Sequence, residues 1–146
     1  MSMHRRPVGR SRILASFGAI AALVGCFLPW WTVGGTDQLP TIGGNAFDSF
    51  GILVFIAAIA TLALVALPYA SERPVSADRW QIYAVFAGAG WLGFVGRIID
   101  LGLSQAFSFR QPVDALSRIP GLWVAGIGLA ILARAIYDMA RERRLR

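Results

Sequence analysis

Four long apolar stretches constrain the fold more than any other feature of this 146-residue chain. They span residues 13–31, 50–69, 80–103 and 119–139. A hydrocarbon core about 30 Å thick is crossed by about 20 helical residues. Inside that core each backbone polar group must be paired within the protein, which favours helices. The sequence therefore predicts an all-α membrane protein, a single domain over residues 1–146 in which four transmembrane helices form one bundle.

The distribution of arginine predicts how this bundle is oriented. The chain has 14 basic residues, all of them Arg. Ten lie before the first stretch, between the second and third, or after the fourth, and an eleventh, Arg134, lies near the end of the fourth. Basic residues that flank spans stay in the cytoplasm. We therefore expect both termini in the cytoplasm and the loops 32–49 and 104–118 on the outside. We attribute the exclusive use of Arg to a GC-rich bacterial genome, and so expect the inner membrane of a bacterium.

The net charge of +6 raises the question of nucleic acid as a partner. Because the positive charges flank apolar stretches and do not form a separate basic domain, they indicate orientation and attraction to anionic lipid. We expect the lipid bilayer as the partner of these charges, and no nucleic acid.

Cys26 is the only cysteine, which excludes a disulfide within the chain. The segment Leu23-Val24-Gly25-Cys26 has the form of a lipoprotein processing box, so cleavage and lipidation at Cys26 are one interpretation. However, the apolar run continues through Trp31, where a processed lipoprotein would have a polar tether. We therefore expect the first helix to remain attached and Cys26 to be a small apolar residue in a helix interface.

The outer end is predicted to form a small cap in which the two outward loops pack on each other. Loop 32–49 is rich in turn-forming residues, and its short apolar segments can pair as a β-hairpin. Aromatic residues gather at this level, as they do at membrane–water interfaces. We single out three as interface candidates: Trp30, Trp31 and Trp123.

Arg97 and Asp100 are the charged residues of the third stretch, and they share one helix face because they are three residues apart. A rise of about 1.5 Å per residue from Trp80 places Arg97 about 25 Å along the helix, near the outer boundary of the hydrocarbon core. Two interpretations follow. Arg97 could pair with Asp100 or Asp48 and hold the cap, or the three could form an outward-facing site for an anionic head group or small anion.

Small residues recur at four-residue spacing in the first, third and fourth stretches. This spacing places them on one helix face, where two backbones can approach closely. The third stretch has the largest number, and we predict that its glycines pack helices together or seat a partner: Gly88, Gly93 and Gly96.

The sequence offers few groups for catalysis. The only histidine, His4, lies in the basic N-terminal segment, and the stretches contain no pair of acidic residues at mid-depth. General acid–base and metal chemistry therefore lack candidate residues, and we expect no enzyme, no cofactor and no metal. The favoured function is a non-catalytic accessory or assembly subunit of a membrane complex, or a homo-oligomer. The alternatives are a small oligomeric transporter or channel, and a protein that binds or senses lipid.

Overall fold

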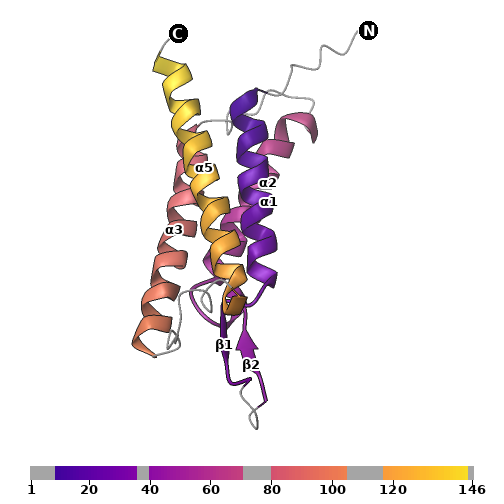
Figure 1. Ribbon diagram of the computed structural model, residues 1–146. Coiled ribbons are helices and arrows are strands. Elements are labelled where there is room, and N and C mark those ends of the chain that lie inside the picture. Colours follow the sequence, from indigo (N-terminus) through magenta and orange to yellow (C-terminus); the bar gives the residue numbers. More distant parts are fainter. Residues whose placement is uncertain (1–8, 36–39, 71–79, 105–116, 145–146) are drawn as a thin grey trace.

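The computed structural model describes residues 9–35, 40–70, 80–104 and 117–144, and it consists of four long helices and a small hairpin (Figure 1). The helices are α1 (Arg10–Phe27), α2 (Ile52–Ala70), α3 (Trp80–Leu103) and α5 (Pro120–Arg144). Each contains an 18-residue segment that is long and apolar enough to cross a membrane. The predicted bundle of four long apolar helices is confirmed, and the length and composition of these helices fit a multi-pass membrane protein.

The four helices form a ring in the order α1, α2, α3, α5, and the chain closes this ring by packing its last helix against its first. Neighbours in the ring are antiparallel. The start of α1 meets the end of α5 where the Ser11 hydroxyl donates to Glu142 at 2.8 Å. The other ends meet where the Gly121 amide donates to the Pro29 carbonyl at 2.9 Å. The start of α1 and the end of α5 therefore lie at one end of the bundle (Figure 1).

The closest helix pair is α1 with α5, because small residues line both sides of the contact. A Cβ atom built on Gly18 would lie 2.7 Å from the backbone nitrogen of Leu132, and one built on Gly128 would lie 2.3 Å from that of Ala22. The two backbones therefore touch, and any side chain at these glycines would separate them. Buried residues recur at alternating spacings of four and three, the heptad pattern of left-handed helix pairs: Ser11, Ala15, Gly18, Ala22 and Gly25, facing Gly121, Ala125, Gly128, Leu132 and Ala135.

The first helix begins and ends earlier than the predicted span 13–31. Helix α1 ends at Phe27, and Leu28 has an extended backbone with φ −81° and ψ 158°. The reason is Pro29, which disfavours a helical conformation at the preceding residue and lacks an amide hydrogen. The other bounds differ from the predicted spans by a few residues at most, except that α5 continues to Arg144 instead of ending at residue 139.

The chain after Pro29 forms the predicted hairpin at the end of the bundle opposite the start of α1 (Figure 1). Strand β1 (Trp31–Val33) pairs antiparallel with β2 (Ile42–Gly44), with Trp31 opposite Gly44. Gly34 and Gly35 follow β1 with φ of 91° and 83°, a conformation that other residues rarely adopt. A short 3-10 helix, η1 (Ala46–Asp48), then leads into α2. Gly51 lets η1 pack on this junction, because a Cβ there would lie 2.4 Å from the Ala46 carbonyl oxygen.

Candidate functional site

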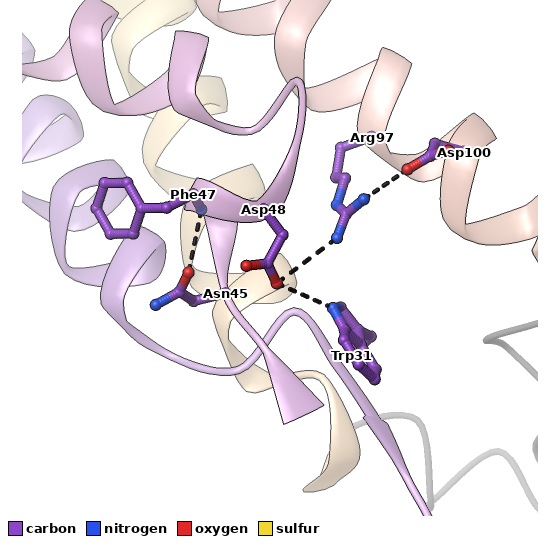
Figure 2. A network of polar contacts seen from close by, with 6 residues as sticks. All are labelled: Trp31, Asn45, Phe47, Asp48, Arg97 and Asp100. Carbon is purple, nitrogen blue, oxygen red and sulfur yellow. Dashed lines mark hydrogen bonds and ion pairs between the residues drawn. The ribbon is translucent and has the colours of Figure 1, made fainter. Parts of the chain in front are cut away.

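Arg97 lies between two carboxylates at the hairpin end of the bundle (Figure 2). Its Nη1 donates to Asp100 Oδ2 at 2.5 Å, one turn further along α3, and its Nη2 lies 3.9 Å from Asp48 Oδ2 of η1. The indole Nε1 of Trp31 donates to the same Asp48 oxygen at 3.3 Å. These four residues, Trp31, Asp48, Arg97 and Asp100, are the Arg97 cluster. The structure brings all three predicted charged residues together.

Gly44 at the end of β2 and the side chain of Asn45, which caps η1, position Asp48. The Asn45 side chain accepts a hydrogen bond from the Phe47 amide at 3.1 Å, which stabilises the first turn of η1 (Figure 2). Gly44 leaves the space that the carboxylate occupies, because a Cβ there would collide with Asp48 Oδ2 and lie 2.4 Å from Trp31 Nε1. Gly44 is therefore part of the site, although the sequence marks it only as a turn former.

The electrostatics of the cluster are those of a buried cation between two half-exposed anions. The side chain of Arg97 is 8% exposed, whereas those of Asp48 and Asp100 are each 48% exposed. Nε of Arg97 is buried and finds no hydrogen-bond partner among the described residues. Both carboxylates keep contact with water, which limits the cost of burying the charge. The cluster joins the hairpin to α3, and its formal charge of −1 does not favour an anion.

The hairpin is also tied to the segment that precedes α5. The Thr32 hydroxyl donates to the Arg118 carbonyl at 2.8 Å, and Arg118 Nη1 donates to the Gly34 carbonyl at 3.4 Å. These bonds connect loop 32–49 with the last residues of loop 104–118. Residues 105–116 lie outside the described residues, so the remainder of the predicted cap stays a prediction.

The three predicted interface tryptophans occupy different environments. Trp30 is fully buried, and its Nε1 donates to the Gly25 carbonyl at 2.8 Å. Its ring packs edge-on against Phe94 of α3, 5.7 Å away between ring centroids. The prediction that Trp30 lies at an interface with lipid or a partner is therefore wrong, because the chain turns at Pro29 and directs this side chain into the bundle. Trp31 is partly buried in the Arg97 cluster, whereas Trp123 is 49% exposed on α5.

The three predicted packing glycines of α3 also differ in what surrounds them. A Cβ on Gly93 would lie 2.6 Å from Leu53 Cβ and 2.7 Å from the Phe50 carbonyl oxygen, so Gly93 permits the close contact with α2. Gly96 lies in ordinary contact distance of the Phe50 ring. Gly88 is exposed and has nothing within 4 Å of a built Cβ, so it packs against no described part of the chain.

Gly88 lies at the centre of an apolar strip on the side of α3 that faces away from the bundle. We name this strip the outward face of α3, and its residues are all exposed: Gln81, Val85, Gly88, Leu92, Val95 and Ile99. Val85 is 69% exposed and Leu92 is 75% exposed. Their side chains project on either side of Gly88 and leave a notch between them. Neither the Arg97 cluster nor this face provides a set of metal ligands: no group of three acidic, His or Cys residues occurs within the described ranges.

The sequence prediction recognised small-residue faces in the first and fourth stretches, but it singled out only the glycines of the third. The prediction named glycines of α3, whereas Gly25, Gly121 and Gly128 make the tightest backbone contacts between the first and last helices. The spacing of seven between Gly18 and Gly25, and again between Gly121 and Gly128, is a signal that could have found them. Comparison of the chain with protein-family models, curated proteins and solved structures finds no match.

Proposed function

We propose that this protein is a non-catalytic interaction protein of the membrane that associates with another transmembrane helix through the outward face of α3. The observation that carries the proposal is the environment of Gly88. Most other glycines within the helices meet a neighbouring helix or side chain at contact distance, whereas Gly88 in mid-span meets none. Glycine notches at such positions allow close helix approach and dispersion contacts.

The shape of this face supports a helix as the partner. Val85 and Leu92 lie one turn to either side of Gly88 and project from the helix, so a second helix can place a ridge in the notch between them. Gln81 is exposed on the same face, and its amide can donate to and accept from a polar residue of a partner. Interhelical hydrogen bonds of this kind stabilise association in membranes.

A non-catalytic role is supported by the hydrogen bonds and ion pairs that polar side chains of the helices form within the chain. Arg97 forms ion pairs with two carboxylates. The Ser11 hydroxyl donates to Glu142, and the Thr61 hydroxyl donates to the Ala57 carbonyl of its own helix. The bundle centre is filled by large side chains, with Trp30, Tyr83, Leu129 and Leu132 fully buried. A transporter or channel would therefore need several copies with a path between them, because the centre of the bundle, as far as the structure describes it, is filled by these side chains.

For the membrane and its orientation, we propose the inner membrane of a bacterium with both termini in the cytoplasm. The bundle supports this because it gathers basic residues at one end. Arg10 and Arg12 begin α1, and Arg141 lies near the end of α5 beside them. The opposite end carries the Arg97 cluster, in which the cation is neutralised. A bacterial origin is supported by composition alone.

Gly88→Ile tests the proposed association. The substitution fills the notch, and it should leave the single bundle intact because no described atom lies within 4 Å of the site. Ala130→Ile on α5 is the control, because it adds similar bulk at another exposed mid-helix position. We expect Gly88→Ile to abolish the oligomer, or the bound partner protein, seen by native mass spectrometry from mild detergent. We expect Ala130→Ile to retain it.

Two outcomes would contradict the proposal. A wild-type protein that is monomeric and free of protein partners both in lipid nanodiscs and in mild detergent would remove its basis. Equal association of wild type and Gly88→Ile would show that the outward face of α3 is a lipid-facing surface only.

A further inference from the structure

A mixed-charge cavity lies between α1 and α5 at the end of the bundle opposite the hairpin. Its volume is about 370 Å³, and it is lined by Arg10, Ser11 and Leu14 of α1 and by Asp138, Arg141 and Glu142 of α5. The cavity lies where two membrane-spanning helices begin and end, which is the level of lipid head groups. Its position is therefore independent of the outward face of α3.

The polar groups of this cavity are partly fixed. Ser11 is 6% exposed, and its hydroxyl donates to Glu142 Oε1 at 2.8 Å, which holds one carboxylate at the cavity. Asp138 accepts a bond from Arg134 at 3.3 Å. Arg10 and Arg141 are exposed and form no ion pair within the described part of the chain. The lining thus presents two unpaired guanidinium groups and two oriented carboxylates.

The helix dipoles add partial charges of opposite sign to the two sides of the cavity. The amide groups at the start of α1 carry partial positive charge, and its first turn contains no acidic residue to neutralise it. The Gly9 cap contributes no side-chain hydrogen bond. A phosphate is favoured at this position by the amides and by Arg10. The two carboxylates lie on α5, in its last turns, where partial negative charge favours a cation.

A second hollow, an apolar groove, is also lined by α1, on the flank toward α2, and it shares no lining residue with the cavity. It lies between α1 and α2, has a volume of about 440 Å³, and is lined by Phe17 and Ile20 on one side and by Leu62 and Val65 on the other. Tyr69 lies in its lining near the end of α2, and Ile13 near the start of α1. Phe17 is 65% exposed and lies two turns from Arg10 on neighbouring parts of the α1 surface. An acyl chain can therefore follow α1 from the cavity into the groove.

From the pairing of this mixed-charge cavity with the apolar groove, we infer that the protein binds a phospholipid whose head group carries both a phosphate and a primary ammonium, as phosphatidylethanolamine does. The phosphate lies between Arg10 and Arg141 at the start of α1. The ammonium donates to the carboxylates of Glu142 and Asp138. An acyl chain lies in the α1–α2 groove. A head group with a phosphate alone would leave Glu142 without a cation and Asp138 with Arg134 as its only one among the described residues.

Native mass spectrometry of the full chain with three lipids that share the same acyl chains tests this inference. Phosphatidylethanolamine has the primary ammonium, phosphatidylcholine has a quaternary ammonium that cannot donate hydrogen bonds, and phosphatidylglycerol has none. We expect binding to be strongest for phosphatidylethanolamine. One basic residue gains about fivefold in attraction to an anionic lipid surface. Taking this as the scale for an Arg–phosphate contact, we expect Arg10→Ala or Arg141→Ala each to weaken binding about fivefold. Arg118→Ala, which removes the same charge at the opposite end, should not.

Glu142→Gln distinguishes head-group recognition from general attraction of lipid. The amide oxygen of Gln can still accept from Ser11, so the helix contact survives while the negative charge is lost. We expect this variant to lose its preference for phosphatidylethanolamine over phosphatidylglycerol. Three outcomes would overturn the inference: equal binding of the three lipids, stronger binding of phosphatidylglycerol by the wild type, or an equal loss of binding in Arg118→Ala.

Discussion

At the scale of single residues, the burial of Arg97 decides the energetic role of the charged cluster. Its side chain is 8% exposed, and it bridges a residue of α3 and a residue of η1. Truncating one partner of a fully buried pair costs about 3–5 kcal/mol, whereas an exposed pair contributes under about 1 kcal/mol. Arg97 falls between these limits because both of its carboxylate partners remain half-exposed and can be hydrated when it is removed.

We predict that Arg97→Ala lowers the free energy of unfolding by about 2 kcal/mol, from loss of the ion pairs and of the packed side-chain stem. Arg134→Ala is the matched control, because Arg134 also pairs with an Asp of its own helix, at 3.3 Å, but is 66% exposed. We expect its effect to stay below about 1 kcal/mol. Denaturant titration of both variants in the same detergent measures the difference. Equal effects would mean that the Arg97 cluster does not hold the hairpin.

The different burial of Trp30 and Trp31 shows a limit of prediction from sequence at the scale of residues. Trp30 and Trp31 are adjacent and equally aromatic, yet one is in the core and the other in a polar cluster at the surface. Nothing in their local sequence separates them, because burial depends on the direction in which the chain leaves Pro29 and on the space beside Phe94. The Arg97–Asp100 pair was predictable, since a spacing of three residues places both on one helix face.

At the scale of elements, the helices themselves were predictable because the bilayer fixes their length and the sequence shows four apolar runs of that length. Their pairing was not predictable from these runs, because a glycine marks a close approach only when another backbone lies opposite it. Gly25 and Gly88 look alike in the sequence. In the structure, Gly25 faces the backbone of Ala125, whereas Gly88 has no neighbour in the described residues.

This contrast predicts opposite effects of the same substitution. In Gly25→Ala the new Cβ would lie 2.4 Å from the backbone nitrogen of Ala125, and backbone cannot move aside as a flexible side chain can. We expect a loss of about 1–3 kcal/mol in the free energy of unfolding, the usual cost of overpacking. Gly88→Ala meets no atom and removes a flexible glycine from a helix, so it should be neutral or stabilising by up to about 1 kcal/mol. Unfolding titrations of both variants in a detergent that keeps the chain monomeric check this pair. Similar losses for both would contradict the α1–α5 contact.

At the scale of the whole molecule, the ring of helices divides the protein into two chemically different ends. The first and last helices meet, so the start of α1 and the end of α5 place their arginines together. The hairpin occupies the other end (Figure 1), and the Arg97 cluster joins the hairpin to α3 there. This asymmetry follows from an even number of antiparallel spans, and it gives the proposed lipid cavity and the hairpin opposite sides of the membrane.

The proposed orientation predicts the accessibility of single cysteines placed at these two ends. Cys26 is fully buried and can be replaced by Ala to give a background without thiols. Thr41→Cys places a thiol on the exposed hairpin, and Glu142→Cys places one near the end of α5 without removing a positive charge. Because basic flanks stay in the cytoplasm, a membrane-impermeant maleimide added to intact spheroplasts should label Thr41→Cys and should label Glu142→Cys only after lysis. The reverse pattern would place the arginine-rich end outside, and labelling of both thiols before lysis would mean that the chain inserts in two orientations.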